Sequence, residues 1–227
     1  RAFTPIESTL PAARVEEMFF RLEAPVHALV ADPASKALLP PWVRVLDVDG
    51  LDSSARLDDP VAVDPEAPGC VVFTSGSTGR PKGVVRNWAA HMEKLNRESR
   101  GAGLIAQVRP FSFSAGLGQL IRVAVGDALH IADLRTKSID ELLAWLQRLE
   151  ATELGIGASL TATLLRSTAG ARCLPHVTTV RLGAEPITWD IVPRVRALVS
   201  PEAEILVQYS ATEVGMATRY AIGPDEP

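Results

Sequence analysis

Residues 74–83 have the sequence Thr74-Ser-Gly-Ser-Thr-Gly-Arg-Pro-Lys82-Gly83, which combines hydroxyl side chains, three glycines and one lysine. They directly follow the apolar run from Cys70 to Phe73, so we expect a strand, a flexible loop and then a helix from about Val84. Glycines let backbone N–H groups approach an anion closely, hydroxyls donate further hydrogen bonds, and lysine adds a mobile positive charge. The stretch therefore predicts a loop that holds a polyphosphate, although a Gly/Ser-rich surface turn has the same composition.

The loop does not have the Walker A sequence, in which a lysine directly follows the last glycine and a hydroxyl residue comes next. Here Arg80 and Pro81 stand between Gly79 and Lys82. Pro81 also lacks the N–H that would donate to a phosphate. The spacing therefore disfavours a P-loop kinase or GTPase.

Instead, the ten residues resemble, nearly residue by residue, the phosphate loop of the adenylate-forming enzymes. This family includes acyl-CoA synthetases, luciferases and the adenylation domains of nonribosomal peptide synthetases. Three further stretches match it in the same order: Ala2-Phe-Thr-Pro-Ile-Glu7 with Leu10-Pro-Ala-Ala-Arg14, Leu182-Gly-Ala-Glu185-Pro, and Gln208-Tyr-Ser-Ala-Thr-Glu213. The first is similar to the adenylation-domain segment Ala-Tyr-Val-Pro-Ile-Asp, and so favours the peptide-synthetase branch over the CoA ligases.

Apolar runs and helix caps also predict the fold. Strands are expected at residues 26–31, 128–132, 177–182 and 205–207, and helices at residues 12–23, after the capping box Ser138-Ile-Asp-Glu141, and near residues 190–199. This alternation predicts an α/β fold with mainly parallel sheets and covering helices, and the resemblance implies part of the large-domain fold of adenylate-forming enzymes. We expect a seam near Asp64, between residues 1–64, an N-terminal α/β part, and residues 65–227, the nucleotide- and acid-binding part.

The resemblance implies that a small carboxylic acid attacks ATP, giving an acyl adenylate and pyrophosphate. Mg²⁺ would assist, and the acyl group would pass to the phosphopantetheine thiol of a carrier-protein domain, or to CoA. The family's ribose-binding aspartate, hinge and small C-terminal domain with a catalytic lysine do not occur in this sequence. We therefore expect the central part of an adenylation domain, inactive in isolation. The alternatives are a non-catalytic nucleotide-binding or scaffold module and an acyl- or aryl-CoA ligase.

Site residues follow from the same resemblance. The β- and γ-phosphates would be held by Thr74, Ser75, Gly76, Ser77, Thr78, Gly79 and Lys82. The implied catalytic residues are Lys82, Thr212, which would bond the α-phosphate, and Glu213, which would bind Mg²⁺. The adenine would contact Gly183, Ala184, Glu185, Gln208, Tyr209 and Ser210, with the Tyr209 ring stacked on the base. The segments after predicted parallel strands are where ligands of such sheets bind.

The acid pocket departs from the family pattern at one position. The resemblance suggests a lining of Ser112, Phe113, Gly116, Gly155, Val180, Leu182, Gln208, Met216 and Ala217, in which the two glycines leave volume for a side group. Amino-acid-activating relatives have an aspartate where this chain has Ser112, and that aspartate pairs with the substrate ammonium. Since serine carries no charge, we expect an acid without a free α-amino group. The alternatives are that another carboxylate holds an ammonium, and that Phe113, Val180 and Leu182 are core residues.

Composition excludes several classes of protein. The 227 residues are 47% hydrophobic and 22% charged, with a net charge of −4, which is ordinary for a globular protein. No basic run favours nucleic acid, and no apolar run reaches the roughly 18 residues that span a bilayer. We therefore expect a cytoplasmic protein that binds neither nucleic acid nor membrane.

Overall fold

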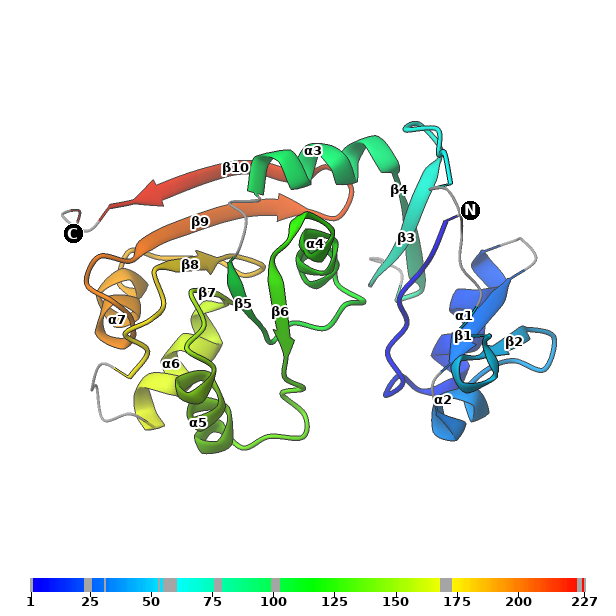
Figure 1. Cartoon of the computed structure of the whole chain (residues 1–227), viewed down its shortest axis with the longest axis horizontal. Coiled ribbons are helices and arrows are strands. Elements are labelled where there is room, and N and C mark those ends of the chain that lie inside the picture. The colour runs from blue at the N-terminus through cyan, green and yellow to red at the C-terminus, as the bar shows by residue number, and fades with distance from the viewer. Residues whose placement is uncertain are drawn as a thin grey trace. The chain divides into compact units, whose positions relative to one another are not determined.

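The structure is a computed structural model that describes residues 2–22, 26–30, 32–52, 54, 61–75, 79–98, 103–167, 173–223 and 226. The chain forms two compact units, Arg1–Ala90 and His91–Pro227, which are drawn together in Figure 1. Helix α3 (Trp88–Glu98) contains the boundary between them. In the part of the chain described, no helix has the length and apolarity needed to cross a membrane.

The first unit combines short helices with two small sheets. Its elements are α1 (Ala12–Arg21), β1 (His27–Val30), α2 (Pro33–Ala37), β2 (Arg44–Asp47), the 3-10 helix η1 (Val48–Gly50), β3 (Pro68–Ser75) and β4 (Pro81–Asn87). Strands β1 and β2 pair in parallel, and β3 and β4 form an antiparallel hairpin. Helix α1 begins after Pro11 and buries Val15 and Phe19, which share one helical face and pack with Val43 in a small core.

The helix predicted from about Val84 is wrong, because residues 81–87 form strand β4 instead. Thr74 pairs with Lys82 and Ser75 with Pro81, and the β-branched Val84 is buried. Valine favours a pleated, half-buried strand, and Pro81 stands at the first strand position, where no ladder N–H is required. The phosphate-loop candidate is therefore the turn of a β-hairpin rather than a strand-to-helix loop.

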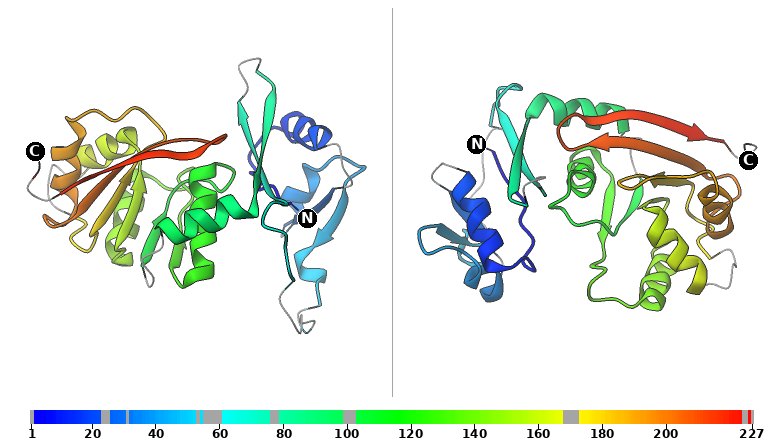
Figure 2. Two further views of the ribbon diagram at one scale, coloured as in Figure 1. Left: turned by 90° about the horizontal axis from the view of Figure 1, so that it is seen from above. Right: turned by 180° about the vertical axis from the view of Figure 1, so that it is seen from behind.

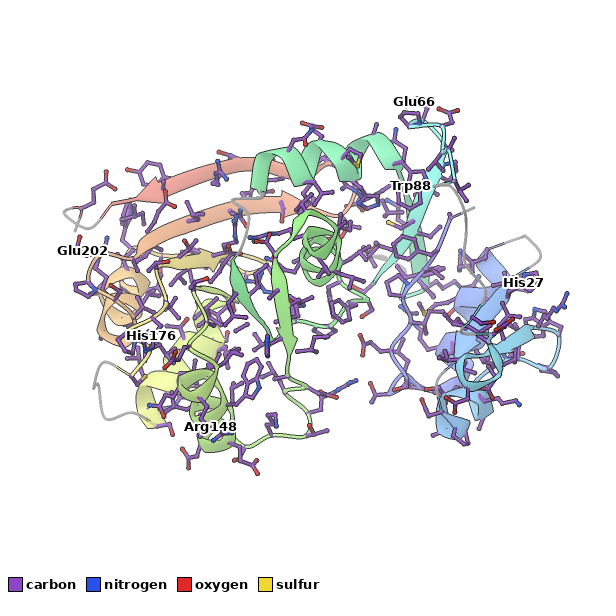
Figure 3. The ribbon with its side chains drawn as sticks, in the orientation of Figure 1. His27, Glu66, Trp88, Arg148, His176 and Glu202 are labelled. Carbon is purple, nitrogen blue, oxygen red and sulfur yellow. The ribbon has the colours of Figure 1, made fainter. Side chains whose placement is uncertain are left out.

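Helix α3 begins after this hairpin. The side chain of Asn87 accepts a hydrogen bond from the N–H of Ala90 at 2.9 Å, which is the usual bond of a residue at a helix start. Asn87 also donates to the Glu66 carboxylate at 2.9 Å, and the Trp88 ring lies 6.3 Å from that of Phe3. Figure 3 labels Glu66 and Trp88 at this end of the hairpin.

The second unit is built on a six-stranded sheet in the order β10-β9-β8-β7-β5-β6. The strands are β5 (Leu104–Gln107), β6 (Ala128–Ile131), β7 (Glu153–Ile156), β8 (Thr179–Leu182), β9 (Glu204–Ala211) and β10 (Gly215–Ile222). Only β10 runs antiparallel to its neighbour among these strands. The helices of this unit after α3 are α4 (Ser114–Arg122), the 3-10 helix η2 (Val123–Val125), α5 (Ile139–Leu149), α6 (Ala158–Ser167) and α7 (Ile191–Leu198). The predicted α/β fold with a mainly parallel sheet and covering helices is thus confirmed.

The two faces of this sheet differ in chemistry. Leu154, Ile156, Val180 and Leu182 belong to an apolar core that buries residues of α5, α6 and α7, and these three helices lie together in Figures 1 and 2.

Helix α5 begins at the predicted capping box, in which Ser138 and Glu141 bond each other's backbone N–H.

Successive residues of a strand point to opposite faces, so Glu153 and Arg181 point away from this core. Arg181 Nε lies 2.6 Å from a Glu153 carboxylate oxygen. From α4, Arg122 contacts the same carboxylate at 2.5 Å and Asp127 at 2.8 Å. Two arginines thus face two carboxylates inside the protein, which balances the buried charge.

The hairpin belongs to the first unit because its strands contact that unit. The N–H of Phe3 donates to Gly69 at 3.1 Å, and Val71 donates to Phe3 at 2.9 Å. Strand β4 also packs beside α1. The two compact units therefore meet after Ala90, and the seam expected near Asp64 between the two functional parts stays a prediction.

Candidate functional site

The described part of the predicted phosphate loop lies at the turn of the β3–β4 hairpin. Gly76, Ser77 and Thr78 lie outside the described residues. Ser75 and Lys82 are exposed at the end of the hairpin, and the Thr74 hydroxyl is 3.5 Å from the Lys82 carbonyl oxygen. The hairpin therefore brings the flanking hydroxyls and the lysine to one end of a strand pair, as a phosphate site requires.

One side chain from outside the hairpin holds this turn. Arg14 of α1 donates from Nη1 to the carbonyl oxygen of Gly79 at 3.0 Å. Gly79 has a φ of 77°, a left-handed conformation that glycine adopts without steric cost. The same Arg14 nitrogen lies 3.6 Å from the Glu17 carboxylate. The motif that ends at Arg14 thus contacts the predicted phosphate loop, a contact that the sequence pattern did not reveal.

In the second unit, the carboxyl ends of the parallel strands gather several predicted residues. Thr212 and Glu213 form the turn between β9 and β10, and Tyr209 on β9 is 69% exposed, as a ring that stacks on a ligand must be. The Thr212 hydroxyl lies 3.4 Å from that of Ser114, which begins α4 directly after the Ser112–Phe113 segment. Because parallel strands end at one sheet edge, the predicted α-phosphate and acid segments are neighbours there.

The turn after β8 is attached to helix α6, which precedes β8 in the chain. The Glu185 carboxylate accepts hydrogen bonds from the Ser159 N–H at 2.9 Å and the Ser159 hydroxyl at 2.6 Å. These bonds lower the pKa of Glu185 below its usual value, and a negative charge at the start of a helix is favourable. Ala184 before it has a φ of 71°, which is uncommon for a residue with a side chain. Glu185, a residue of the predicted adenine-binding turn, therefore contacts α6.

Three glycines at this edge permit close contacts. A Cβ atom at Gly116 would meet the Pro110 carbonyl oxygen at 2.1 Å, one at Gly157 would meet Glu185 at 1.9 Å, and one at Gly183 would meet the Gln208 carbonyl oxygen at 2.7 Å. The space expected beside Gly116 is thus occupied by backbone atoms of Arg109 and Pro110.

The other predicted pocket residues are in different surroundings. Val180 and Leu182 have no exposed surface and belong to the apolar core, whereas Phe113 is 62% exposed. Met216 is half-buried, and Ala217 is exposed on β10. The alternative that all three are core residues therefore agrees with the positions of Val180 and Leu182 but not with that of Phe113. Their roles in a pocket stay predictions.

Arg109 is a candidate residue that the motifs did not identify. Its Nη2 donates to the Ile156 carbonyl oxygen at 2.9 Å, and its Nη1 would lie 3.4 Å from a Cβ atom at Gly155. Burial lowers the pKa of the guanidinium, while the negative charge of Glu185 counteracts this effect. The available signal was an arginine two residues after the end of β5, in the segment that leads to Ser112.

The described residues include no group of three or more His, Cys, Asp or Glu side chains that could bind a metal ion. The exposed Glu213 offers one hard oxygen ligand. Mg²⁺ is often bound by one or two carboxylates together with substrate phosphates. The donor set at the β9–β10 turn therefore fits a Mg²⁺ ion that arrives with a nucleotide.

Comparison with protein families and curated proteins gives consistent matches. The profile of a family described as "AMP-binding enzyme" matches residues 2–227. Nonribosomal peptide synthetase 5 of Gibberella zeae is 27% identical over 93% of this chain and 2% of its own length. AM-toxin synthetase AMT1 of Alternaria alternata is 26% identical over 99% of this chain and 5% of its own length. Dapdiamide synthesis protein DdaD of Enterobacter agglomerans is 25% identical over 96% of this chain and 36% of its own length.

Solved structures are similar in fold. The nonribosomal peptide synthetase FmoA3, solved with bound α-methyl-L-serine-AMP, superposes with a TM-score of 0.82 at 20% identity, over 97% of this chain and 26% of its own. CmiS6 superposes with a TM-score of 0.80 at 23% identity, over 100% of this chain and 56% of its own. The predicted large-domain fold is thus confirmed, and this chain spans only part of each relative.

Proposed function

The chain belongs to the family of AMP-binding enzymes, and on this premise we propose that the intact protein activates a carboxylic acid with ATP. A carboxylate oxygen of the acid attacks the α-phosphorus, the bond to the β-phosphate oxygen breaks, and acyl adenylate and pyrophosphate form. No protein nucleophile is required, so catalysis consists of alignment and stabilisation of charge on the phosphate oxygens.

The observation that carries this proposal is the pairing of Thr212 with Ser114 at 3.4 Å. It joins the turn proposed to hold the α-phosphate to the segment proposed to hold the acid, which are the two reacting groups. The exposed ring of Tyr209, on the strand that leads to Thr212, offers a stacking surface for adenine. Bound Mg²⁺ would neutralise phosphate charge, with Glu213 as a ligand.

The β3–β4 hairpin is proposed to hold the β- and γ-phosphates. Lys82 supplies a positive charge for the leaving pyrophosphate, and the hydroxyls of Thr74 and Ser75 supply donors. The activated acyl group is then transferred to a thiol of carrier-protein phosphopantetheine, with release of AMP. The peptide-synthetase relatives favour this acceptor over CoA.

Pyrophosphate exchange into ATP by the intact protein tests the reaction. We expect exchange that depends on an added acid, from a panel of amino, hydroxy, keto and aryl acids. Thr212→Val, which keeps shape but removes the hydroxyl, should lower kcat/KM for ATP by about 10²-fold, the scale of losing one preorganised donor. ATP binding without exchange for any acid would instead favour a non-catalytic nucleotide-binding module.

The acceptor and the acid are tested separately. Loading of a phosphopantetheinylated carrier protein, measured beside loading of CoA, distinguishes the two thiols. Because Ser112 has no charge for an ammonium, acids without a free α-amino group should exchange faster than the matching amino acids. Preference for a free α-amino acid would contradict this part of the proposal.

A further inference from the structure

We propose that Arg109 determines the class of acid that this site accepts, and that the acid carries a second carboxylate which Arg109 binds. The inference rests on the proposed acid activation and adds to it the charge of the substrate. Three observations support it: the place of Arg109 at the sheet edge, its unused hydrogen-bond donors, and the distribution of charge around it.

Arg109 lies on the sheet face that the α4 segment covers, at the carboxyl end of β5. Gly155 stands between Leu154 and Ile156, which belong to the apolar core on the other face, so the missing side chain of Gly155 would point toward the α4 face. Arg109 Nη1 would be 3.4 Å from a Cβ atom there. The guanidinium therefore lies over Gly155, a part of β7 that bears no side chain. Arg109 itself belongs to the chain segment that leads to Ser112.

The guanidinium has donors to spare. An arginine side chain carries five N–H donors, and within the described part of the chain that of Arg109 forms a single hydrogen bond, to the Ile156 carbonyl oxygen at 2.9 Å. It forms no ion pair with a carboxylate among the described residues. Since Arg109 is partly buried, a carboxylate that accepted two of these donors would satisfy them with favourable geometry.

Two carboxylates of the described part of this unit, Glu153 and Glu185, are already engaged by other residues. Glu153, on the same face, is already paired with Arg181 at 2.6 Å and Arg122 at 2.5 Å. Glu185 acts on Arg109 through its charge, but its oxygens accept hydrogen bonds from Ser159 at 2.9 and 2.6 Å. A partly buried cation without a directly bonded anion is costly, and a substrate carboxylate would supply that anion.

Gln208 offers a second polar contact on this face. It stands next to Gly183 on the neighbouring strand, and its Nε2 is buried without a hydrogen-bond partner in the described part of the chain. Strands β5 and β9 are separated by β7 and β8, so their backbones are roughly 14 Å apart at 4.8 Å per strand. An acid that contacted both Arg109 and Gln208 would therefore be short rather than long.

Matched substrate pairs test the inference in the intact protein. Pyrophosphate exchange is measured with succinate against succinamate, glutarate against glutaramate, and phthalate against phthalamate, which differ in charge but hardly in size. We expect kcat/KM to favour the diacid by about 10- to 100-fold, the scale of a hydrogen bond to a charged group. Arg109→Gln should abolish or reverse this ratio, and Arg109→Lys should retain part of it. Arg148→Gln, an exposed substitution on α5 (Figure 3), should leave it unchanged.

Each outcome of these measurements supports or overturns the role of Arg109 in binding a second carboxylate. If Arg109 only supports Ile156, Arg109→Gln lowers exchange equally for both members of a pair, and the inference fails. Wild-type exchange that is as fast with the monoamides as with the diacids overturns the inference while supporting acid activation. Absence of exchange with every acid overturns the proposed function and this inference with it. If Arg109→Gln does not fold, as judged by its circular dichroism, the wild-type ratios and Arg109→Lys still decide.

Discussion

The phosphate-loop hairpin and the carboxyl edge of the large sheet are held in different ways. The described part of the hairpin turn receives a side-chain bond from Arg14 to the carbonyl oxygen of Gly79 at 3.0 Å, and its ends at Ser75 and Lys82 are exposed. The large sheet is fixed to α4 by a buried ion cluster, and its carboxyl edge contains glycines that admit backbone contacts. Regions with few buried contacts open locally at low free energy, so the hairpin can adjust to phosphate while the sheet edge keeps its geometry.

This comparison predicts opposite responses to substitution. Changes in the hairpin should alter ATP kinetics with little effect on the melting temperature. Changes in the ion cluster should mainly lower the melting temperature. Four substitutions test this division.

The largest effect is expected from Glu153→Gln. The change leaves Arg122 and Arg181 without their shared carboxylate, and breaking a buried ion pair costs about 3–5 kcal/mol. Thermal or denaturant unfolding of the intact protein measures the loss. Glu202→Gln, an exposed control (Figure 3), should unfold like the wild type. A stable Glu153→Gln protein would show that the cluster does not hold the sheet together.

Lys82→Ala should lower kcat/KM for ATP by about 10²-fold or more, because it removes a positive charge from the proposed pyrophosphate site. The melting temperature should stay near that of the wild type, since Lys82 is exposed. Lys36→Ala, an exposed control in the same unit, should leave both unchanged. Normal ATP kinetics in folded Lys82→Ala would reduce the hairpin turn to a structural feature.

Arg14→Gln should have a smaller effect, in the same direction. It removes the bond to the Gly79 carbonyl oxygen, and one exposed hydrogen bond contributes about 0.5–1.5 kcal/mol, which corresponds to a rise in KM for ATP of about 2- to 12-fold. The KM for the acid should not change, since the bond that is lost is to the proposed phosphate loop. A general loss of folding would instead alter the KM values for both substrates. Arg44→Gln is the matched exposed control. Equal changes in both KM values would contradict a positioning role.

The smallest expected effect is the pH dependence due to Glu185. Because Ser159 lowers its pKa, the contribution of Glu185 to stability is present above the ordinary value of 4.5 and is lost as the pH falls through the lowered pKa. Glu185→Gln should cost about 1 kcal/mol at neutral pH, as loss of a helix cap does, and should flatten the acid side of the curve of melting temperature against pH. An unchanged curve would show that the contact with α6 contributes nothing.

Local patterns made part of this structure predictable. The capping box of Ser138 and Glu141 is specified within four residues, and α5 begins there. The apolar run before Thr74 correctly predicted β3. Val84 and Val85 were harder, because a short apolar run fits a strand or a helix, and only pairing with Val72 and Val71 decides between them.

The rest depends on contacts between distant parts of the chain. Arg122, Glu153 and Arg181 are far apart in sequence, and which of them meet depends on strand order and register. Helix α4 was not predicted, since Gly116 and Gly118 weaken the helical signal. The structure explains Gly116 by its close contact with the Pro110 carbonyl oxygen. Arg109 has no motif around it, so only its place beside Gly155 makes it a candidate.

The attachment of Glu185 to α6 also constrains the order in which this unit can form. The first N–H groups of a helix have no partner within the helix itself, and α6 receives one of its acceptors from a residue that follows it by 26 positions. The start of α6 is therefore completed only after β8 has added to the sheet and the turn at Gly183 and Ala184 has formed. Folding of two successive βα segments is coupled through this carboxylate, so α6 should acquire protection from amide hydrogen exchange together with β8 rather than before it.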